Sequence, residues 1–272
     1  RPLKDGVIAD FDVTKAMIKY FLTVVRKDRK IQKPKMVVGV PSGITMVEKK
    51  AVVDACFQVG IRDTYLIEEP MAAAIGSDMP IELPRGNMVV DIGGGTTEVA
   101  IISLAATAYS ESLRVAGDEL DESIVRYLQK KHQIAIGLIA AEKIKLEGAS
   151  VYPTEGRGNA LNVVGKDLLT GIPKSMRITS EEIREAIEEP VSAIIDSIRR
   201  ALEKLPPEFA SDLNESGMVL TGGGALLGGL DRRIEKETGI NVYVADDPLL
   251  SVVLGAGKAL EDMPRYKKVF IN

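Results

Sequence analysis

The amino-acid sequence predicts an α/β protein with two lobes, and three observations lead to this prediction. Short β-branched runs alternate with segments of helical period, which is the pattern of strands and helices packed against a sheet. Two runs of three glycines, at residues 93–95 and 222–224, each follow a short apolar run. At 272 residues the chain is long enough to bury two cores with a cleft between them.

The first part of the chain reads as strand, helix, strand and helix. Residues 35–40 are a β-branched run that ends at a Pro-Ser-Gly turn, which predicts a buried strand. Thr45 and Glu48 have capping-box spacing, so a helix begins there and continues to Gly60. Residues 64–67 predict the next strand, and Pro70 suits the start of the helix that follows.

The middle of the chain predicts a hairpin and then a helix. Residues 87–90 and 98–103 are strands too close together for a crossover connection, so we expect them to be antiparallel. A third strand is predicted at residues 112–115, and apolar residues at helical spacing continue through residues 120–128. Scattered Gly and Pro in residues 148–175 indicate short strands and loops.

The last part of the chain returns to helical period. A long amphipathic helix is predicted from Thr179 to Leu205, and we expect Pro190 to kink or divide it. Residues 218–220 predict a strand, and residues 226–238 predict a helix after the second glycine run.

Composition excludes several classes of protein. Forty-five per cent hydrophobic and 27 per cent charged residues, without a long uncharged apolar run, exclude a membrane-spanning chain. A net charge of -4 gives no reason to expect a nucleic-acid partner. With one cysteine and one histidine, neither a Cys/His metal cluster nor a disulfide framework is expected. This composition predicts a cytoplasmic protein.

The turn at residues 91–97 is the first candidate site. A strand ends in Asp91 and the chain reverses through three glycines, whose amides can point inward and cradle anionic oxygens. Asp91 would hold Mg²⁺ through water, and Thr96 and Thr97 offer hydroxyls. The alternative is a glycine-rich hairpin with a solvated aspartate. The candidate ligand-binding residues are Asp91, Gly93, Gly94, Gly95 and Thr96.

The second glycine run lies between a strand and an amphipathic helix, where backbone often approaches a nucleotide. The run is Gly222, Gly223 and Gly224, and the third glycine of a dinucleotide fingerprint would fall at Leu227. The sequence also lacks a Walker-type motif. Close packing of helix on strand is the alternative explanation for these glycines.

Three charged residues are candidates for roles beside the glycine runs. Glu69 lies at a helix start and could orient a water molecule toward a γ-phosphate, or it could simply stabilise the first helical turn. Glu142 and Lys145 are three residues apart on one helical face. They could bracket a nucleoside or form a surface ion pair.

Together these segments resemble the actin, heat-shock chaperone and sugar-kinase superfamily and, within it, the MreB family of bacterial actins. The resemblance is carried by residues 66–76, 91–100, 114–119 and 219–227, and the opening residues 1–10 fit it too. It implies an actin-like fold in which ATP and Mg²⁺ bind between two lobes, each built on a ribonuclease H-like sheet with helices on both faces. The implied first lobe is residues 1–84 and 252–272, the core of the second is 85–119 and 180–251, and its smaller subdomain is 120–179.

The resemblance also implies a role for each candidate residue. Asp91 and Gly93 to Thr96 correspond to the second phosphate loop, and Glu69 to the carboxylate that positions the attacking water. Gly117 corresponds to a ribose contact, Gly222 to Gly224 to the adenosine loop, and Glu142 and Lys145 to the pair that flanks the nucleoside.

The function implied by the resemblance is a slow ATPase that polymerises into paired protofilaments on the inner face of the cell membrane. Its partners would be other copies of itself, the membrane surface and the cell-wall elongation machinery of rod-shaped cells. The rival hypotheses are a metabolite kinase and a chaperone-like or scaffold ATPase of the same superfamily.

Two segments depart from the family pattern. The family carries a first phosphate loop before the position of Arg1, so we expect the first lobe to be incomplete at its N-terminus. Residues 26–35, where the family's membrane-insertion loop would fall, contain six basic residues and a single large apolar residue, Ile31. Any membrane contact of this segment is therefore expected to be electrostatic, and a solvated loop is the alternative.

Overall fold

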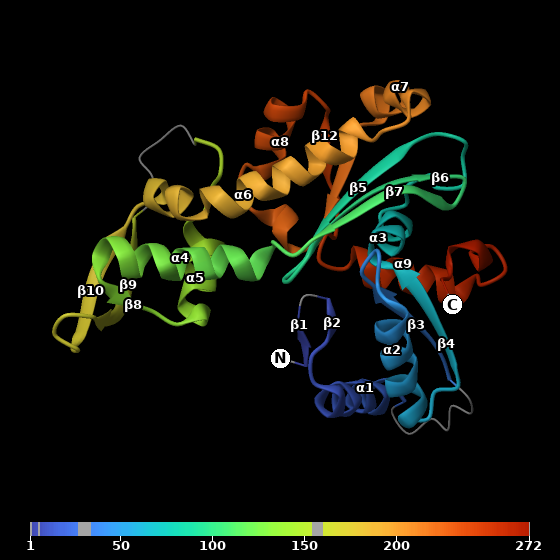
Figure 1. The fold of residues 1–272 in the computed structure, drawn as a ribbon, viewed down its shortest axis with the longest axis horizontal. Coiled ribbons are helices and arrows are strands. Elements are labelled where there is room, and N and C mark those ends of the chain that lie inside the picture. Colours follow the sequence, from blue (N-terminus) through green and yellow to red (C-terminus); the bar gives the residue numbers. More distant parts are fainter. Residues whose placement is uncertain (1, 5, 27–33, 154–159, 272) are drawn as a thin grey trace.

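The computed structural model describes residues 2–4, 6–26, 34–153 and 160–271. Helices and strands alternate along the chain as an α/β protein requires (Figure 1). The elements are β1 (Leu3–Lys4), β2 (Val7–Ile8), α1 (Phe11–Arg26), β3 (Lys35–Val40), α2 (Met46–Gln58), β4 (Asp63–Glu68), α3 (Glu69–Gly76), β5 (Asn87–Ile92), β6 (Thr97–Ser103), β7 (Ala106–Leu113), α4 (Gly117–His132), β8 (Ile134–Ala135), α5 (Leu138–Gly148), β9 (Leu161–Asp167), β10 (Pro173–Ile178), α6 (Ser180–Glu203), α7 (Pro207–Ser216), β11 (Met218–Thr221), the 3₁₀ helix η1 (Gly223–Leu226), α8 (Leu230–Thr238), β12 (Val242–Val244), α9 (Ser251–Glu261) and the 3₁₀ helix η2 (Lys267–Val269).

A five-stranded sheet lies at the centre, in the order β12-β11-β5-β6-β7. β5, β11 and β12 are parallel, whereas β6 runs antiparallel to both of its neighbours, β5 and β7, as the short connections predict. Every residue of β5 and β6 is buried, because helices cover both faces of the sheet.

Two hydrophobic cores lie on the two faces of this sheet. The larger one joins the sheet to α4, α6 and α8, and the smaller one joins the opposite face to α3 and α9. Figure 1 shows α6 and α3 on opposite sides of the sheet. The alternation along β5 explains this, since Met88 and Val90 belong to the first core and Val89 to the second.

α3 and α9 pack with their backbones in contact. A Cβ atom on Gly76 would lie 1.8 Å from the carbonyl oxygen of Ser251, and one on Gly255 would lie 1.8 Å from that of Ala72. Only glycine fits at both positions, because any side chain would overlap the facing helix. The apolar run at residues 71–75 is therefore a buried helix between the sheet and α9.

The described residues form three smaller sheets, of which the antiparallel pair β1 and β2 is the first. β3 and β4 form a parallel pair flanked by α1 and α2, in the lower right of Figure 1. β8, β9 and β10 form an antiparallel sheet beside α4 and α5, at the left. The domain boundaries predicted from the sequence, 84/85, 119/120, 179/180 and 251/252, remain a prediction.

The structure corrects three predicted elements. The strand predicted at residues 112–115 is β7, which ends at Leu113. The helix predicted from residue 226 begins at Leu230, because η1 tightens the chain directly after the glycines. Pro190 does not divide α6, which runs without a break from Ser180 to Glu203. It lies buried within the helix, where packing offsets the lost backbone hydrogen bond.

Candidate nucleotide site

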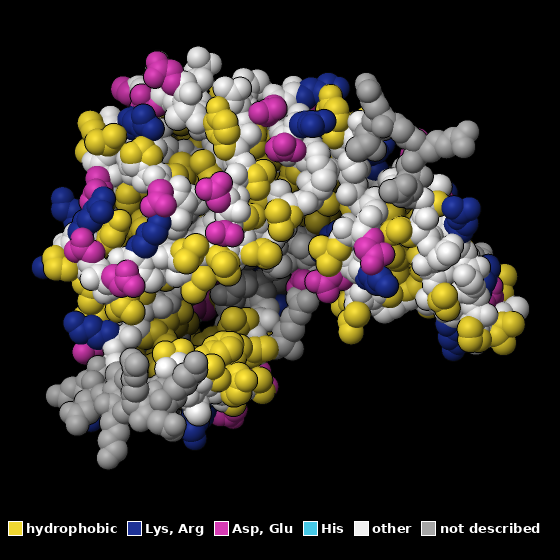
Figure 2. All heavy atoms as spheres, turned by 180° about the vertical axis from the view of Figure 1, so that it is seen from behind, with side chains coloured by type: hydrophobic (Ala, Val, Ile, Leu, Met, Phe, Trp, Pro, Cys, Tyr) yellow, Lys and Arg dark blue, Asp and Glu magenta, His cyan; other side chains and the backbone are white. Residues whose placement is uncertain are grey.

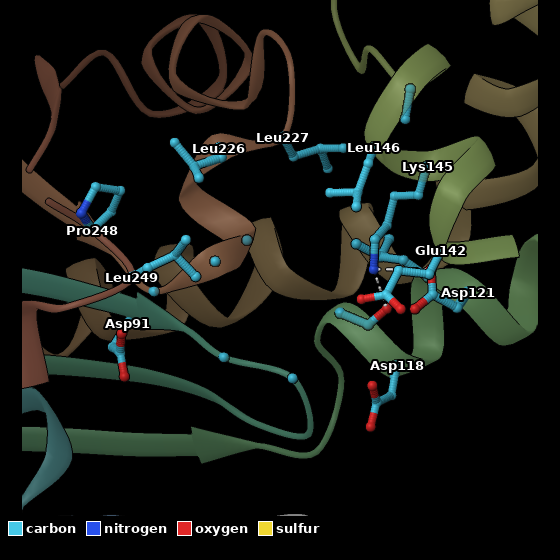
Figure 3. Close-up of a pocket in the computed structure, with 18 of the residues that line it drawn as sticks. Asp91, Asp118, Asp121, Glu142, Lys145, Leu146, Leu226, Leu227, Pro248 and Leu249 are labelled. Carbon is cyan, nitrogen blue, oxygen red and sulfur yellow. Dashed lines mark hydrogen bonds and ion pairs between the residues drawn. The ribbon is translucent and has the colours of Figure 1, made fainter. Parts of the chain in front are cut away.

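A cavity of about 610 Å³ opens at the edge of the central sheet, between α4, α5 and the segment from η1 to α9 (Figure 3). This volume is in the range of sites for small molecules and cofactors. Its lining includes nine of the predicted site residues, namely Asp91, Gly93, Gly94, Gly117, Glu142, Lys145, Gly222, Gly223 and Gly224. Residues from four distant parts of the sequence thus meet in one cavity.

The glycine turn after β5 is held by the start of α4. The amide of Gly117 donates to the carbonyl of Gly93 at 3.1 Å, and the amide of Asp118 donates to that of Gly94 at 2.7 Å. In the described chain, the Gly94 amide donates to no backbone carbonyl. Among the described glycines, those with left-handed φ do not include Gly93, Gly94 or Gly95, so positive φ is not the reason for glycine in this turn.

Asp91, the second-last residue of β5, lies at one side of the cavity, as Figure 3 shows. Its side chain is buried, and its Oδ1 accepts a hydrogen bond from the Thr221 hydroxyl at 2.9 Å. Burial raises the pKa of Asp91, because the ionised form loses its hydration. A cation at this end of the cavity would stabilise the ionised form of Asp91 and lower its pKa again.

The glycines of the second run pack closely against Ile92 and also line the cavity. Gly222 has φ +77° and its amide donates to the carbonyl of Pro248 at 2.8 Å. A Cβ on Gly222 would lie 2.3 Å from the carbonyl oxygen of Ile92, and one on Gly224 would lie 2.2 Å from Ile92 Cγ2. Close packing, the alternative explanation from the sequence, is therefore present at residues that also line the cavity.

The charged residues on α5 face the start of α4. Lys145 Nζ lies 2.9 Å from Asp121 Oδ1 in an ion pair whose side chains are 14% and 7% exposed, and it donates to the carbonyl of Gly117 at 2.8 Å. The predicted alternative, a surface pair of Lys145 with Glu142, is therefore wrong, since the partner is the buried Asp121. Burial raises the pKa of Asp121 and Lys145 lowers it, while Glu142 and Asp118 raise it further.

An apolar wall completes the cavity, and the sequence analysis missed it. Figure 3 shows Leu226, Leu227 and Leu146 on one side and Pro248 and Leu249 on another. Leu226 and Leu227 follow the glycine run after a single residue, Ala225, which is a signal that could have found them. An apolar surface of this kind suits the faces of a planar ring.

Three predicted residues do not line this cavity. Thr96 is buried, and its carbonyl accepts from the amide of Gly93 at 2.9 Å. Gly95 lines an adjoining cavity of about 400 Å³, which shares Asp118 and Glu142 with the first. The hydroxyl of the neighbouring Thr97 donates to the carbonyl of Val115 at 2.7 Å, so it is engaged in the fold.

Glu69 is the third, and it lies half-buried at the first residue of α3. Burial, with Asp91 and then Glu98 as nearby negative charges, raises the pKa of Glu69 to about 8. Glu98 on β6 is fully buried, and burial raises its pKa to about 7 against hydrogen bonds from Ser112 and Ser42 that lower it. Glu98 lies within residues 91–100, which carry the family resemblance, but no role for it was predicted.

The residues present fit a nucleotide and its metal ion. The glycine turn leaves backbone amides for anionic oxygens, and the apolar wall suits a base. Among the described residues, three or more Asp, Glu, His or Cys side chains do not gather closely enough to hold a metal by themselves. Mg²⁺ usually takes one or two carboxylates together with phosphate oxygens and water, and Asp91 offers such a carboxylate at the cavity.

Comparison with known proteins gives relatives over nearly the whole chain. The cell shape-determining protein MreB of Escherichia coli (strain K12) is 49% identical over 262 residues, which are 96% of this chain and 75% of the relative. The cell shape-determining protein Mbl of Bacillus subtilis (strain 168) is 42% identical over 268 residues, 98% of this chain and 80% of the relative.

Solved structures agree with the sequence matches. The crystal structure of MreB5 of Spiroplasma citri bound to ADP superposes with a TM-score of 0.92 at 32% identity, covering 98% of this chain and 80% of that one. The MamK double helical filament shares the fold, with a TM-score of 0.80 at 23% identity over 96% of this chain and 80% of the other. The sequence profile of the MreB/Mbl protein family matches residues 1–268. The chain therefore belongs to the MreB/Mbl family of actin-like, cell shape-determining proteins.

Proposed function

We propose that this chain binds ATP with Mg²⁺ in the cavity of about 610 Å³ and hydrolyses it slowly as it assembles into filaments. The observation that carries the proposal is the convergence of Asp91, the two glycine runs and the pair on α5 in that one cavity. Its relative from Spiroplasma citri is described bound to ADP and, in a second structure, to AMPPNP.

Each wall of the cavity has a proposed part in nucleotide binding. The amide of Gly94, which donates to no backbone carbonyl in the described chain, would receive phosphate oxygens, and Asp91 would hold Mg²⁺ through water. Glu142 would accept hydrogen bonds from the ribose, while Leu226 and Leu249 would cover the base. Lys145 is already paired with Asp121, so we assign it to fixing α5 against Gly117.

Glu69 is the proposed catalytic carboxylate. With its pKa near 8, this group is mostly protonated at neutral pH in the chain alone, and a protonated carboxyl cannot accept a proton from water. A cation held beside Asp91 would offset the Asp91 charge, which is one of the causes that raise the pKa of Glu69. Glu69 would then be ionised, and it would orient the attacking water by accepting its hydrogen bond.

Self-assembly is the second part of the proposal. Figure 2 shows hydrophobic side chains over the lower-left part of the molecule, where α1 and α2 lie after the half turn from Figure 1. On these helices Tyr20, Phe21, Val25 and Phe57 are 54% to 71% exposed. Exposed apolar residues gathered on one face mark interaction surfaces, and contact between copies of the chain would cover them.

We place the protein at the inner face of the cell membrane with the cell-wall elongation machinery, on the strength of its relatives' role in cell shape. Among the helices of the described residues, none combines the length and the apolar character needed to cross a membrane. The basic segment at residues 26–35 lies mostly outside the described residues, which omit 27–33. The kinase and chaperone alternatives gain no specific support from the cavity.

Sedimentation of the full-length protein tests the proposal. We expect more polymer in the pellet with ATP and Mg²⁺ than with ADP, and Phe21→Glu should lower the pelleted fraction without changing nucleotide affinity. Glu69→Ala should bind ATP within about threefold of wild type and release phosphate at least about tenfold more slowly. Soluble protein that phosphorylates a sugar would contradict the filament function, and unchanged turnover of Glu69→Ala would remove Glu69 from catalysis.

A further inference from the structure

One buried carboxylate joins the central sheet to the loop that follows β3. Glu98 lies on β6 directly after the glycine turn, and it is opposite Asp91 on β5 and opposite Ser112 on β7. It is fully buried, although a charged residue is seldom buried without a specific set of partners. The hydrogen-bond partners of Glu98 therefore indicate its role.

The two oxygens of Glu98 accept hydrogen bonds from two different parts of the fold, one in the central sheet and one in the loop after β3. Oε1 accepts from the hydroxyl of Ser112 at 2.6 Å, within the central sheet. Oε2 accepts from the backbone amide of Ser42 at 3.0 Å, in the loop between β3 and α2. A single side chain thus fixes the distance between that loop and the strand that leaves the glycine turn.

The loop held by Glu98 lies beside Glu69. β3 and β4 are parallel and in register, so that Val40 pairs with Glu68. Ser42 lies two residues after Val40, and Glu69 directly follows Glu68. Both residues are therefore at the same edge of the sheet. A Cβ on Gly39 would lie 3.5 Å from Glu69 Cγ, which confirms that the end of β3 packs on the Glu69 side chain.

We propose that Glu98 is a positioning residue for the hydrolysis reaction, which sets the place of Glu69 relative to the phosphate turn by holding the amide of Ser42. The inference rests on the proposed ATPase function. Glu98 lines neither cavity in the described structure, so its effect passes through the Ser42 loop and not through contact with the nucleotide.

A second hydrogen bond between the same two parts of the molecule supplies a matched control. Thr107 on β7 donates its hydroxyl to Glu68 Oε2 at 3.0 Å, and Thr107 does not line either cavity. Thr107→Val removes a bond between the sheets while leaving the Glu98 to Ser42 contact in place. The two variants separate a specific positioning role from a general loss of contact between the sheets.

The test measures ATP affinity and single-turnover hydrolysis separately in the full-length protein. For Glu98→Ala we expect a hydrolysis rate at least about tenfold lower with an ATP Kd within about threefold of wild type. Glu98→Gln should recover most of the rate, because its amide oxygen still accepts from Ser42 and its amide nitrogen can donate to Ser112. Thr107→Val should change neither quantity by more than about twofold.

Several results would overturn the proposal. These are a wild-type rate in Glu98→Ala, an equal loss in Thr107→Val, or a loss of affinity with the rate constant unchanged. If Glu98→Ala does not fold, amide exchange in the wild-type protein decides: Ser42 should exchange more slowly than its neighbour Gly43, and free exchange at Ser42 would refute the contact. A wild-type protein that binds or hydrolyses no ATP would instead refute the proposed function, whatever the variants do.

Discussion

The two glycine runs at residues 93–95 and 222–224 have the same composition, yet the structure gives them different surroundings. A Cβ on Gly222 or Gly224 would fall 2.2 to 2.3 Å from atoms of Ile92, whereas a Cβ on Gly94 would meet Asp118 Oδ1 at an ordinary 3.8 Å. In the second run, Gly222 and Gly224 are therefore required by the fold itself. The fold leaves room for a side chain at Gly94. The glycine there therefore keeps the cavity in front of the turn open for a ligand.

The largest effect that this comparison predicts is on folding. Gly222→Ala should lower the free energy of unfolding by about 3 kcal/mol or more, because the methyl group overlaps the Ile92 backbone at a residue with φ +77°. Chemical denaturation of wild type and variant measures the difference. A loss below about 1 kcal/mol would show that the two runs do not differ in this way.

Gly94→Ala should do the opposite, changing ligand binding and not folding. We expect a free energy of unfolding within about 0.5 kcal/mol of wild type and an ATP affinity lower by about tenfold to a hundredfold, or roughly 1.4 to 2.8 kcal/mol. Calorimetric titration with ATP and Mg²⁺ measures the affinity. Gly137→Ala is the control, since the structure also leaves room there and Gly137 lies outside both cavities. Equal affinities for Gly94→Ala and wild type would contradict the role of the turn.

Acidic residues beside the first glycine run have raised pKa values, and these predict a pH dependence. The pKa of Glu69 rises from an ordinary 4.5 to about 8, so between these values the folded chain holds a proton that the unfolded chain has lost. The free energy of unfolding without nucleotide should therefore fall as pH rises from about 5 to 8, by at most about 1.4 kcal/mol per pH unit for this group.

Glu69→Gln should flatten that dependence, because an amide does not titrate. Urea denaturation at several pH values measures the slope, and the exposed Glu203→Gln controls for the change of one charge. Glu98, with its pKa near 7, adds to the wild-type slope below that pH. A slope in Glu69→Gln as steep as in wild type would show that Glu69 is not the titrating group.

The smallest effect is expected within the second run. A Cβ on Gly223 would meet Leu249 Cδ2 at 3.1 Å, and Leu249 is an exposed side chain that can move aside. Gly223→Ala should thus cost no more than about 0.5 kcal/mol of unfolding free energy, in contrast to its neighbour Gly222. Thermal unfolding of the two variants side by side tests the contrast. Equal losses would mean that the whole run is rigid.

Local patterns predicted most of the fold. Thr45 and Glu48 form the capping box that their spacing predicts, and Thr179 with Glu182 forms another at the start of α6. The unbroken course of α6 through Pro190 was not predictable, because the core that surrounds Pro190 is made by segments distant in sequence. The limits of β7 were missed because its alternating residues are polar and half-buried at the edge of the sheet.

The predicted site was incomplete for a related physical reason. Motifs identify residues whose neighbours in sequence share their role, such as Gly93 and Gly94. Asp121 pairs with Lys145 from another helix, and Leu249 faces a glycine run 25 residues away, so their roles follow from the tertiary structure. Glu98 stood inside a quoted motif, but its partner Ser42 is 56 residues earlier.

The glycine crossing of α3 and α9 has a mechanical consequence. Backbone atoms in direct contact cannot yield as side chains do by changing rotamer, so the two helices must shift together as one lever. One arm of that lever carries Glu69, and the other begins at Ser251, next to Leu249 and Val252 in the cavity wall. A displacement of that wall would therefore move α9 and α3 together, and Glu69 would move by nearly the same distance.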